Sequence, residues 1–213
     1  MSDTAAKLEV IAAQVRKCTA CRLCETRTKA VSGVGAASAK VMLIGEGPGK
    51  NEDLKGEPFV GAAGKFLDTM LAEVGWQRSD VFITNVVKCR PPQNRDPELD
   101  EVETCTSLYL FKQIALIKPL VIVPLGRHAL GRFVPGVSIS AVHGKAMRRN
   151  GQVYFAMYHP AVALYNGSTR ETLIKDFKKL PKLLRLIEEQ KTQVDSLIEE
   201  MAAPEEKDKL QKN

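Results

Sequence analysis

Along the chain, short uninterrupted apolar runs alternate with longer segments in which apolar residues recur every three or four positions. The short runs are typical of buried strands and the periodic segments of amphipathic helices. Strands are predicted at residues 41–44 (VMLI), 81–84 (VFIT), 120–125 (LVIVPL) and 153–158 (VYFAMY). Helices are predicted over residues 4–15, 62–74 and 97–117, with further helices starting near Arg127 and Arg170. This alternation predicts a single α/β domain of three α/β/α layers with a mainly parallel central sheet.

The predicted helix over residues 97–117 carries its own start signal. Asp96 has a side chain suited to an N-cap, and Pro97 fits the first helical position. Acidic residues follow in the first turn, where they favour the helix dipole. We therefore expect Asp96 to cap this helix.

The composition is that of one soluble domain. The chain has 213 residues, of which 44% are hydrophobic and 26% charged, and no apolar run approaches the roughly 18 residues that would span a bilayer. We expect a cytoplasmic monomer with no membrane association.

The charge is distributed unevenly. Residues 188–213 contain eight Asp or Glu and four Lys and so carry a net charge of −4. Because the whole chain carries +6, the first 187 residues carry a net charge of +10. We expect a folded domain over residues 1–187 and a charged tail over 188–213 that begins as a frayed helix and ends in disorder. A basic body is typical of proteins that bind DNA or RNA, although a solvated surface has the same charge pattern.

Unusual residues follow three of the predicted strands. GEGPG follows the first strand, Asn85 the second and His159 the last. Ligands bind outside the carboxyl ends of strands in an open parallel sheet, so these residues predict one pocket. Asn85 could pair with a base edge or cap the backbone, and His159 could bind a ligand or sit satisfied at the core edge. Phe59, in a Gly- and Pro-containing loop, could stack on a base or pack into the core.

The stretch LIGEGPGKNE, residues 43–52, resembles a phosphate-binding loop but fails both common patterns. A P-loop requires glycine where Ile44 stands and Ser or Thr where Asn51 stands. The dinucleotide fingerprint requires its third glycine at Lys50. We therefore expect these glycines to let the backbone near Gly47 approach a ligand closely.

The five cysteines predict a metal site rather than disulfides. Their number is odd, and three of them cluster as Cys18, Cys21 and Cys24, followed by Cys89 and Cys105. Four thiolates at such spacings suit structural zinc or a [4Fe-4S] cluster equally. The segment KCRPPQNRDP, residues 88–97, lies immediately beside the cysteines and has three prolines and the cations Lys88, Arg90 and Arg95, which predicts a stiff, basic wall for phosphates.

Taken in order, these motifs resemble those of the family 4 uracil-DNA glycosylases, the iron-sulfur type. The matching pieces cover about residues 15–185 and are CTAC at 18–21, GEGPG at 45–49, GEPFVG at 56–61, ITNVVKCRPPQNR at 83–95, Cys105, VPLG at 123–126 and HPA at 159–161. Where many relatives have an arginine, this chain has Tyr165.

The resemblance implies a cofactor and a set of site residues. A [4Fe-4S] cluster would be held by Cys18, Cys21, Cys89 and Cys105, with Cys24 a spare thiol or a competitor for Cys21. Uracil would be bound by six residues: Glu46, Gly47, Pro48, Phe59, Asn85 and His159. Among these, Glu46 or the backbone beside Gly47 would position water, Asn85 would read the base edge, and His159 would stabilise charge on the departing uracil.

The function predicted on this basis is removal of uracil from DNA, single- or double-stranded, by hydrolysis of the N-glycosidic bond. The product is an abasic site, the starting point of base excision repair. The alternative is a non-catalytic iron-sulfur module that binds DNA with the same fold.

Overall fold

The fold is built on a six-stranded sheet with the strand order β1-β3-β2-β4-β6-β5. The strands, in the computed structural model, are β1 (Val34–Gly35), β2 (Val41–Gly45), β3 (Phe82–Asn85), β4 (Val121–Pro124), β5 (Ala146–Arg149) and β6 (Gln152–Phe155). The four central strands are parallel, and β1 and β5 run antiparallel at the two edges. The predicted mainly parallel sheet is confirmed. The edge strands β1 and β5 were not predicted, because the first spans two residues and the second is mostly exposed.

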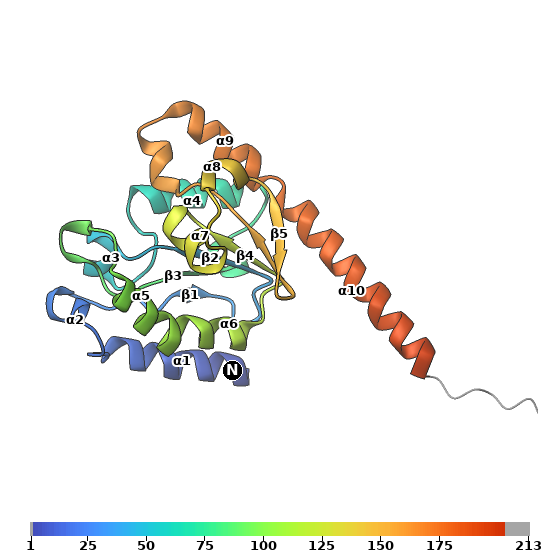
Figure 1. The fold of residues 1–213 in the computed structure, drawn as a ribbon, viewed down its shortest axis with the longest axis horizontal. Helices are drawn as coiled ribbons and strands as arrows, with labels where there is room; N and C mark the ends of the chain where they lie inside the picture. Colours follow the sequence, from blue (N-terminus) through green and yellow to red (C-terminus); the bar gives the residue numbers. More distant parts are fainter. Residues whose placement is uncertain (1, 203–213) are drawn as a thin grey trace, which may run out of the picture.

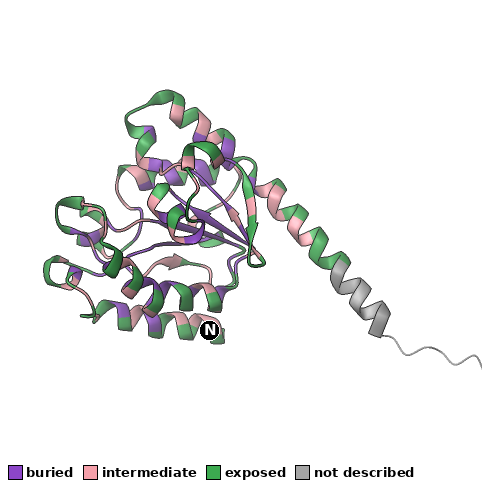
Figure 2. Cartoon of the chain, viewed as in Figure 1, coloured by how far each residue is buried: buried purple, intermediate pink, exposed green. Residues whose placement is uncertain are grey.

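Helices cover both faces of the sheet, which confirms the three-layer α/β/α arrangement (Figure 1). On one face lie α1 (Asp3–Arg16), α5 (Leu99–Cys105) with α6 (Phe111–Ile117), and α7 (Arg127–Phe133). On the other lie α4 (Ala62–Ala72), α9 (Gly167–Phe177) and the start of α10 (Leu180–Ala202). All five residues of β2 are buried, and they alternate between the two layers. The sheet is therefore the buried centre of the molecule (Figure 2).

The predicted helix over residues 97–117 exists, but its start and its interior differ from the prediction. The N-cap is Glu98, not Asp96, and Glu98 forms a capping box with Glu101. Glu101 is also paired with Arg95 at 2.6 Å, whereas the Asp96 carboxylate lies 3.2 Å from His128 Nε2 instead of capping the helix. A π-helical segment at Thr106–Leu110 separates α5 from α6 directly after Cys105. Such insertions often mark functional sites.

The remaining helices are short connectors. They are α2 (Leu23–Thr26), α3 (Lys50–Lys55) and α8 (Ile139–Val142). Helix α9 begins at Gly167 rather than near Arg170, because the Asn166 side chain accepts hydrogen bonds from the backbone N–H groups of Ser168 and Thr169. None of the helices within residues 2–202 has an apolar stretch that would cross a bilayer.

The structure describes residues 2–202, with side chains as far as residue 193. Helix α10 packs against the body through its first turns and then runs away from it (Figure 1). The predicted boundary between residues 187 and 188 therefore falls inside one continuous helix. The predicted disordered end of the tail lies outside the described residues.

Candidate active site

A cavity of about 400 Å³ opens at the carboxyl ends of β2 and β3, a size suited to one small ligand. The structure brings together here all six residues singled out from the sequence: Glu46, Gly47, Pro48, Phe59, Asn85 and His159. Its other walls include Glu52 of α3 and three residues of the proline-rich loop at residues 88–97: Pro91, Asn94 and Arg95. Segments far apart in the chain thus meet at the edge of the sheet where a parallel topology predicts a ligand.

Asn85 presents an unpartnered acceptor to this site. Its side-chain Oδ1 is buried and has no hydrogen-bond donor among the described residues, while its backbone carbonyl accepts from Lys88 Nζ at 2.8 Å. The amide therefore does not cap the strand through Oδ1. A buried acceptor without a donor costs about 1–3 kcal/mol, so the geometry favours a ligand that supplies an N–H.

Gly45 makes room for the two side chains at the floor of the site. A Cβ at this position would lie 2.4 Å from Asn85 Oδ1 and 2.7 Å from the Phe59 ring. At Gly47 a Cβ would meet the Val87 side chain at 2.8 Å. The first glycine of GEGPG, not the second, is therefore the one that lets Phe59 and Asn85 meet.

Phe59 is held in an unusual backbone conformation. Its φ is +53°, in the left-handed region that aromatic residues rarely adopt. The Arg78 guanidinium donates to the carbonyl oxygens of Phe59 and, at 3.0 Å, of Pro58. The ring is 5% exposed and belongs to the core, yet it also lines the cavity. Both interpretations of Phe59 from the sequence thus describe part of its environment.

His159 is a neutral hydrogen-bond donor in this setting. Burial lowers the pKa of its imidazole to about 4, although nearby Glu52 opposes that shift. Its Nδ1 accepts from the backbone N–H of Ala161 at 3.2 Å, which leaves the proton of the neutral ring on Nε2. The ring lies 5.7 Å from that of Phe59, at an interplanar angle of 29°. The site therefore has a ring face, an orphan acceptor and an N–H donor side by side.

The proline-rich loop is less basic at the surface than predicted. Lys88 is buried, and its Nζ donates to Thr84 Oγ1, the Asn85 carbonyl and Gln113 Oε1. Burial lowers the pKa of this amine to about 8. Lys88 therefore stabilises the end of β3 from inside the fold through these hydrogen bonds. The prediction that it lies at the surface and contacts phosphate was wrong.

The five cysteines line one small cavity between α1, α2 and the middle of the 99–117 helix, around Cys105. Three N–H groups point at sulfur: Arg27 Nη1 to Cys89 Sγ at 3.0 Å, Lys88 N to Cys105 Sγ at 3.2 Å and Ala20 N to Cys18 Sγ at 3.5 Å. Donors of this kind stabilise metal-bound thiolates.

The thiols around this cavity form a possible set of metal ligands. Cys24 lines the same cavity as the other four cysteines. Several thiols that face one cavity are a donor set that fits a thiolate-bound metal group.

Several known proteins are similar in sequence to most of this chain. A sequence model described as the uracil DNA glycosylase superfamily matches residues 32–185. The type-4 uracil-DNA glycosylase of Saccharolobus solfataricus is 48% identical over 187 residues, which cover 83% of this chain and 86% of the relative. That of Thermotoga maritima is 42% identical over 183 residues, 84% and 95% of the two chains. A type-5 uracil-DNA glycosylase of Pyrobaculum aerophilum is 29% identical over 165 residues, 68% and 72% of the two chains.

Proposed function

The chain belongs to the uracil DNA glycosylase superfamily, as its motifs predicted, and we propose that it is a type-4 uracil-DNA glycosylase. It hydrolyses the bond between uracil and deoxyribose in DNA, releases free uracil and leaves an abasic site for base excision repair. The observation that carries this proposal is the orphan acceptor of Asn85, which lies with Phe59 and His159 in one cavity.

Uracil matches the hydrogen-bonding groups of the cavity. A base inside duplex DNA is out of reach, so it must leave the stack, at a cost of a few kcal/mol. Stacking on the Phe59 ring returns about 1–3 kcal/mol. Asn85 Oδ1 accepts from N3–H of uracil, and the Asn85 amide N–H donates to O4. Cytosine has no N3–H and carries a donor at position 4, so it would leave Asn85 Oδ1 unpaired.

The chemistry follows from the groups around the base. As the bond between C1′ and N1 breaks, its electron pair moves into the uracil ring and negative charge grows on O2. The Nε2–H of neutral His159 donates to that oxygen. Water attacks C1′, and its proton passes to the Glu46 carboxylate, with the backbone beside Gly47 helping to position the water. The uracil anion then takes a proton from solvent.

The segment after His159 offers contacts to DNA around the flipped nucleotide. Val162, Leu164 and Tyr165 are 42%, 42% and 89% exposed in the turn that directly follows the cavity. Apolar side chains at such positions enter base steps and fill the space that a flipped base leaves. Tyr165 supplies an aromatic face where an arginine was expected from relatives.

We propose that Cys18, Cys21, Cys89 and Cys105 hold a [4Fe-4S] cluster, with Cys24 free. The shared cavity of these thiols and the N–H groups aimed at sulfur support this assignment. When bound, the cluster would supply structural bracing, because Cys18 and Cys21 lie in the N-terminal segment and Cys89 and Cys105 flank the segment that forms a wall of the active site.

One assay tests the activity. The protein is incubated with single-stranded and duplex oligonucleotides that carry a single uracil, and abasic sites are revealed by alkali. Cleavage at uracil only after alkali is expected for a monofunctional glycosylase, with thymine and cytosine oligonucleotides left intact. An Asn85→Ala, His159→Ala double variant should lose the activity. Binding of uracil DNA without any base release would instead favour the non-catalytic DNA-binding module.

A further inference from the structure

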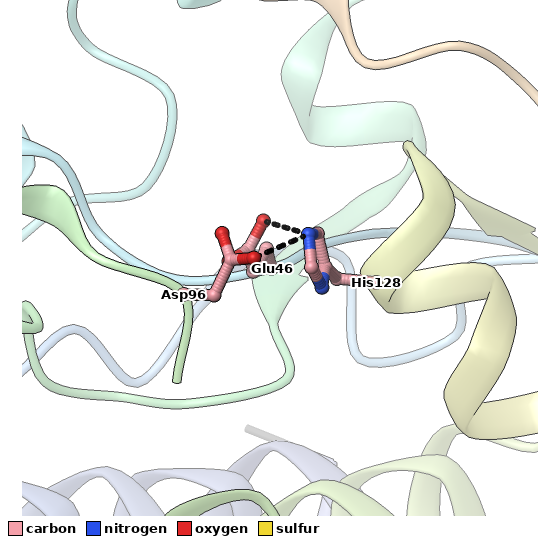
Figure 3. A group of neighbouring side chains, drawn as sticks. All are labelled: Glu46, Asp96 and His128. Atoms are coloured by element: carbon pink, nitrogen blue, oxygen red, sulfur yellow. Dashed lines mark ion pairs between the residues drawn. The ribbon is translucent and has the colours of Figure 1, made fainter. Parts of the chain in front are cut away.

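Three side chains from separate parts of the chain converge beside the cavity (Figure 3). Glu46 follows β2, Asp96 precedes the helix at Leu99, and His128 lies in the first turn of α7. His128 Nε2 lies 3.2 Å from Asp96 Oδ2 and 3.9 Å from Glu46 Oε2. The sequence marked Asp96 only as a helix cap and gave no signal for His128.

Arg127 completes the group. Its Nε donates to His128 Nε2 at 2.8 Å, and its Nη2 lies 3.5 Å from Asp96 Oδ2. The carboxylates and the imidazole could in principle ligate a divalent cation. Yet the imidazole nitrogen that would bind the cation already accepts from a guanidinium, whose positive charge opposes a second cation. The geometry therefore favours a network of side chains over a metal site.

The network acts on a carboxylate that is already perturbed. Burial raises the pKa of Glu46, and Asp96 adds to that increase, whereas His128 and Arg127 lower it. The other titratable groups that line the space around His128 are Tyr158 and His159, from the segment after β6. A general base must be ionised and aimed at its water, so the guanidinium of Arg127, which His128 Nε2 holds at 2.8 Å, favours the working state of Glu46.

We propose that His128 is a positioning residue for Glu46, held in place by Asp96 and Arg127. This inference rests on the proposed function, in which Glu46 takes the proton of the attacking water. His128 does not line the cavity, so it is not placed to touch uracil or the reacting sugar. It keeps the Glu46 carboxylate ionised and directed into the cavity.

A double-mutant cycle tests the proposal. Single-turnover rates of uracil release are measured on a single-stranded oligonucleotide for wild type, Glu46→Gln, His128→Ala and the double variant. Glu46→Gln should lower the rate about 100-fold and His128→Ala about tenfold. If His128 acts through Glu46, the double variant should be no slower than Glu46→Gln. The apparent affinity for DNA should stay within about twofold of wild type.

The pH profile supplies a readout that a structural role would not move. Without His128 the Arg127 guanidinium loses its partner beside Glu46 and the pKa of Glu46 rises further, so the acid limb of the rate profile of His128→Ala should shift to higher pH. His128→Gln keeps a side-chain oxygen that accepts from Arg127, so it should recover part of the rate and bring the limb back toward its wild-type position. His143 forms a comparable pair with Asp176, at 2.7 Å, away from the cavity. His143→Gln is therefore the matched control and should leave the limb in place.

Each other outcome is decisive. If His128→Ala lowered the rate by the same factor in Glu46→Gln as in wild type, His128 would act independently of Glu46. A weaker affinity with an altered salt dependence would make His128 a phosphate contact. A rate that rises with added Mn²⁺ in wild type but not in His128→Ala would indicate a metal site. Full activity of Glu46→Gln would remove this inference but leave the proposed function standing, whereas a wild type that releases no uracil would remove the function itself.

Discussion

At the scale of single residues, the site depends on strain at Phe59 that neighbouring groups hold in place. A left-handed aromatic residue costs about 1–3 kcal/mol, and Arg78 secures it through the carbonyl oxygens of Pro58 and Phe59. Arg78→Ala should let the Phe59 loop relax and lower kcat/KM for uracil DNA at least about tenfold. Asp68→Asn removes the negative charge that pairs with Arg78 Nε at 2.6 Å, without touching the loop. It should keep most of the activity, and comparable losses in both variants would contradict this role of Arg78.

Also at the residue scale, His159 gives the protein a specific acid sensitivity. Its pKa falls from about 6.5 in the unfolded chain to about 4 in the fold. Between these values the unfolded chain binds a proton that the folded chain does not, so lowering the pH through this window reduces the free energy of unfolding. The loss from this group reaches about 3 kcal/mol near pH 4 and is absent near neutral pH.

His159→Gln lacks this titration. Its free energy of unfolding should therefore fall less than that of wild type between about pH 7 and about pH 4, by up to about 3 kcal/mol. Urea denaturation at several pH values measures the difference between the two proteins. Parallel curves across the whole range would show that His159 is not the buried neutral group described above.

At the scale of elements, the sequence predicted what periodicity and strand ends reveal. The central strands, the long helices and the meeting of Glu46, Asn85 and His159 at one edge all follow from hydrophobic patterns and parallel topology. Side-chain contacts across the fold do not. In the sequence Lys88 is one of three cations in a loop, but in the fold its side chain is buried because its Nζ donates to three buried acceptors. Asp96 has the features of an N-cap, but the pair of Arg95 with Glu101 moves the cap to Glu98.

The cysteine-bearing elements give a prediction about the cofactor. Cys89 and Cys105 are buried beside Cys18 and Cys21, whereas Cys24 sits in the short helix α2 and lines the same cavity. If four thiolates hold the cluster, Cys89→Ser should lose visible absorption and most of its iron and sulfide, with a lower melting temperature. Cys24→Ser should keep about four iron atoms per chain. Loss of iron in Cys24→Ser would place Cys24 in the ligand set instead.

At the scale of the whole molecule, charge is divided unevenly along the chain. The first 187 residues are basic, and the acidic excess lies in the last 26. Phosphate neutralisation by a basic body makes DNA affinity depend steeply on salt. An acidic segment on the same chain weakens that attraction over a Debye length of about 10 Å or more at low salt. The tail should therefore moderate non-specific binding rather than the chemistry of the pocket.

Two truncations separate charge from length. Removing residues 194–213 takes away six acidic and three basic residues, which raises the net charge from +6 to +9. Removing only residues 203–213 takes away three of each sign and leaves the net charge at +6. The longer deletion should bind uracil-free DNA more tightly than wild type at about 50 mM salt, with the difference shrinking near about 200 mM. The shorter deletion should match wild type at both, because its charge is unchanged. Fluorescence anisotropy titrations measure these affinities, and equal gains from both deletions would mean that the tail acts by its bulk and not by its charge.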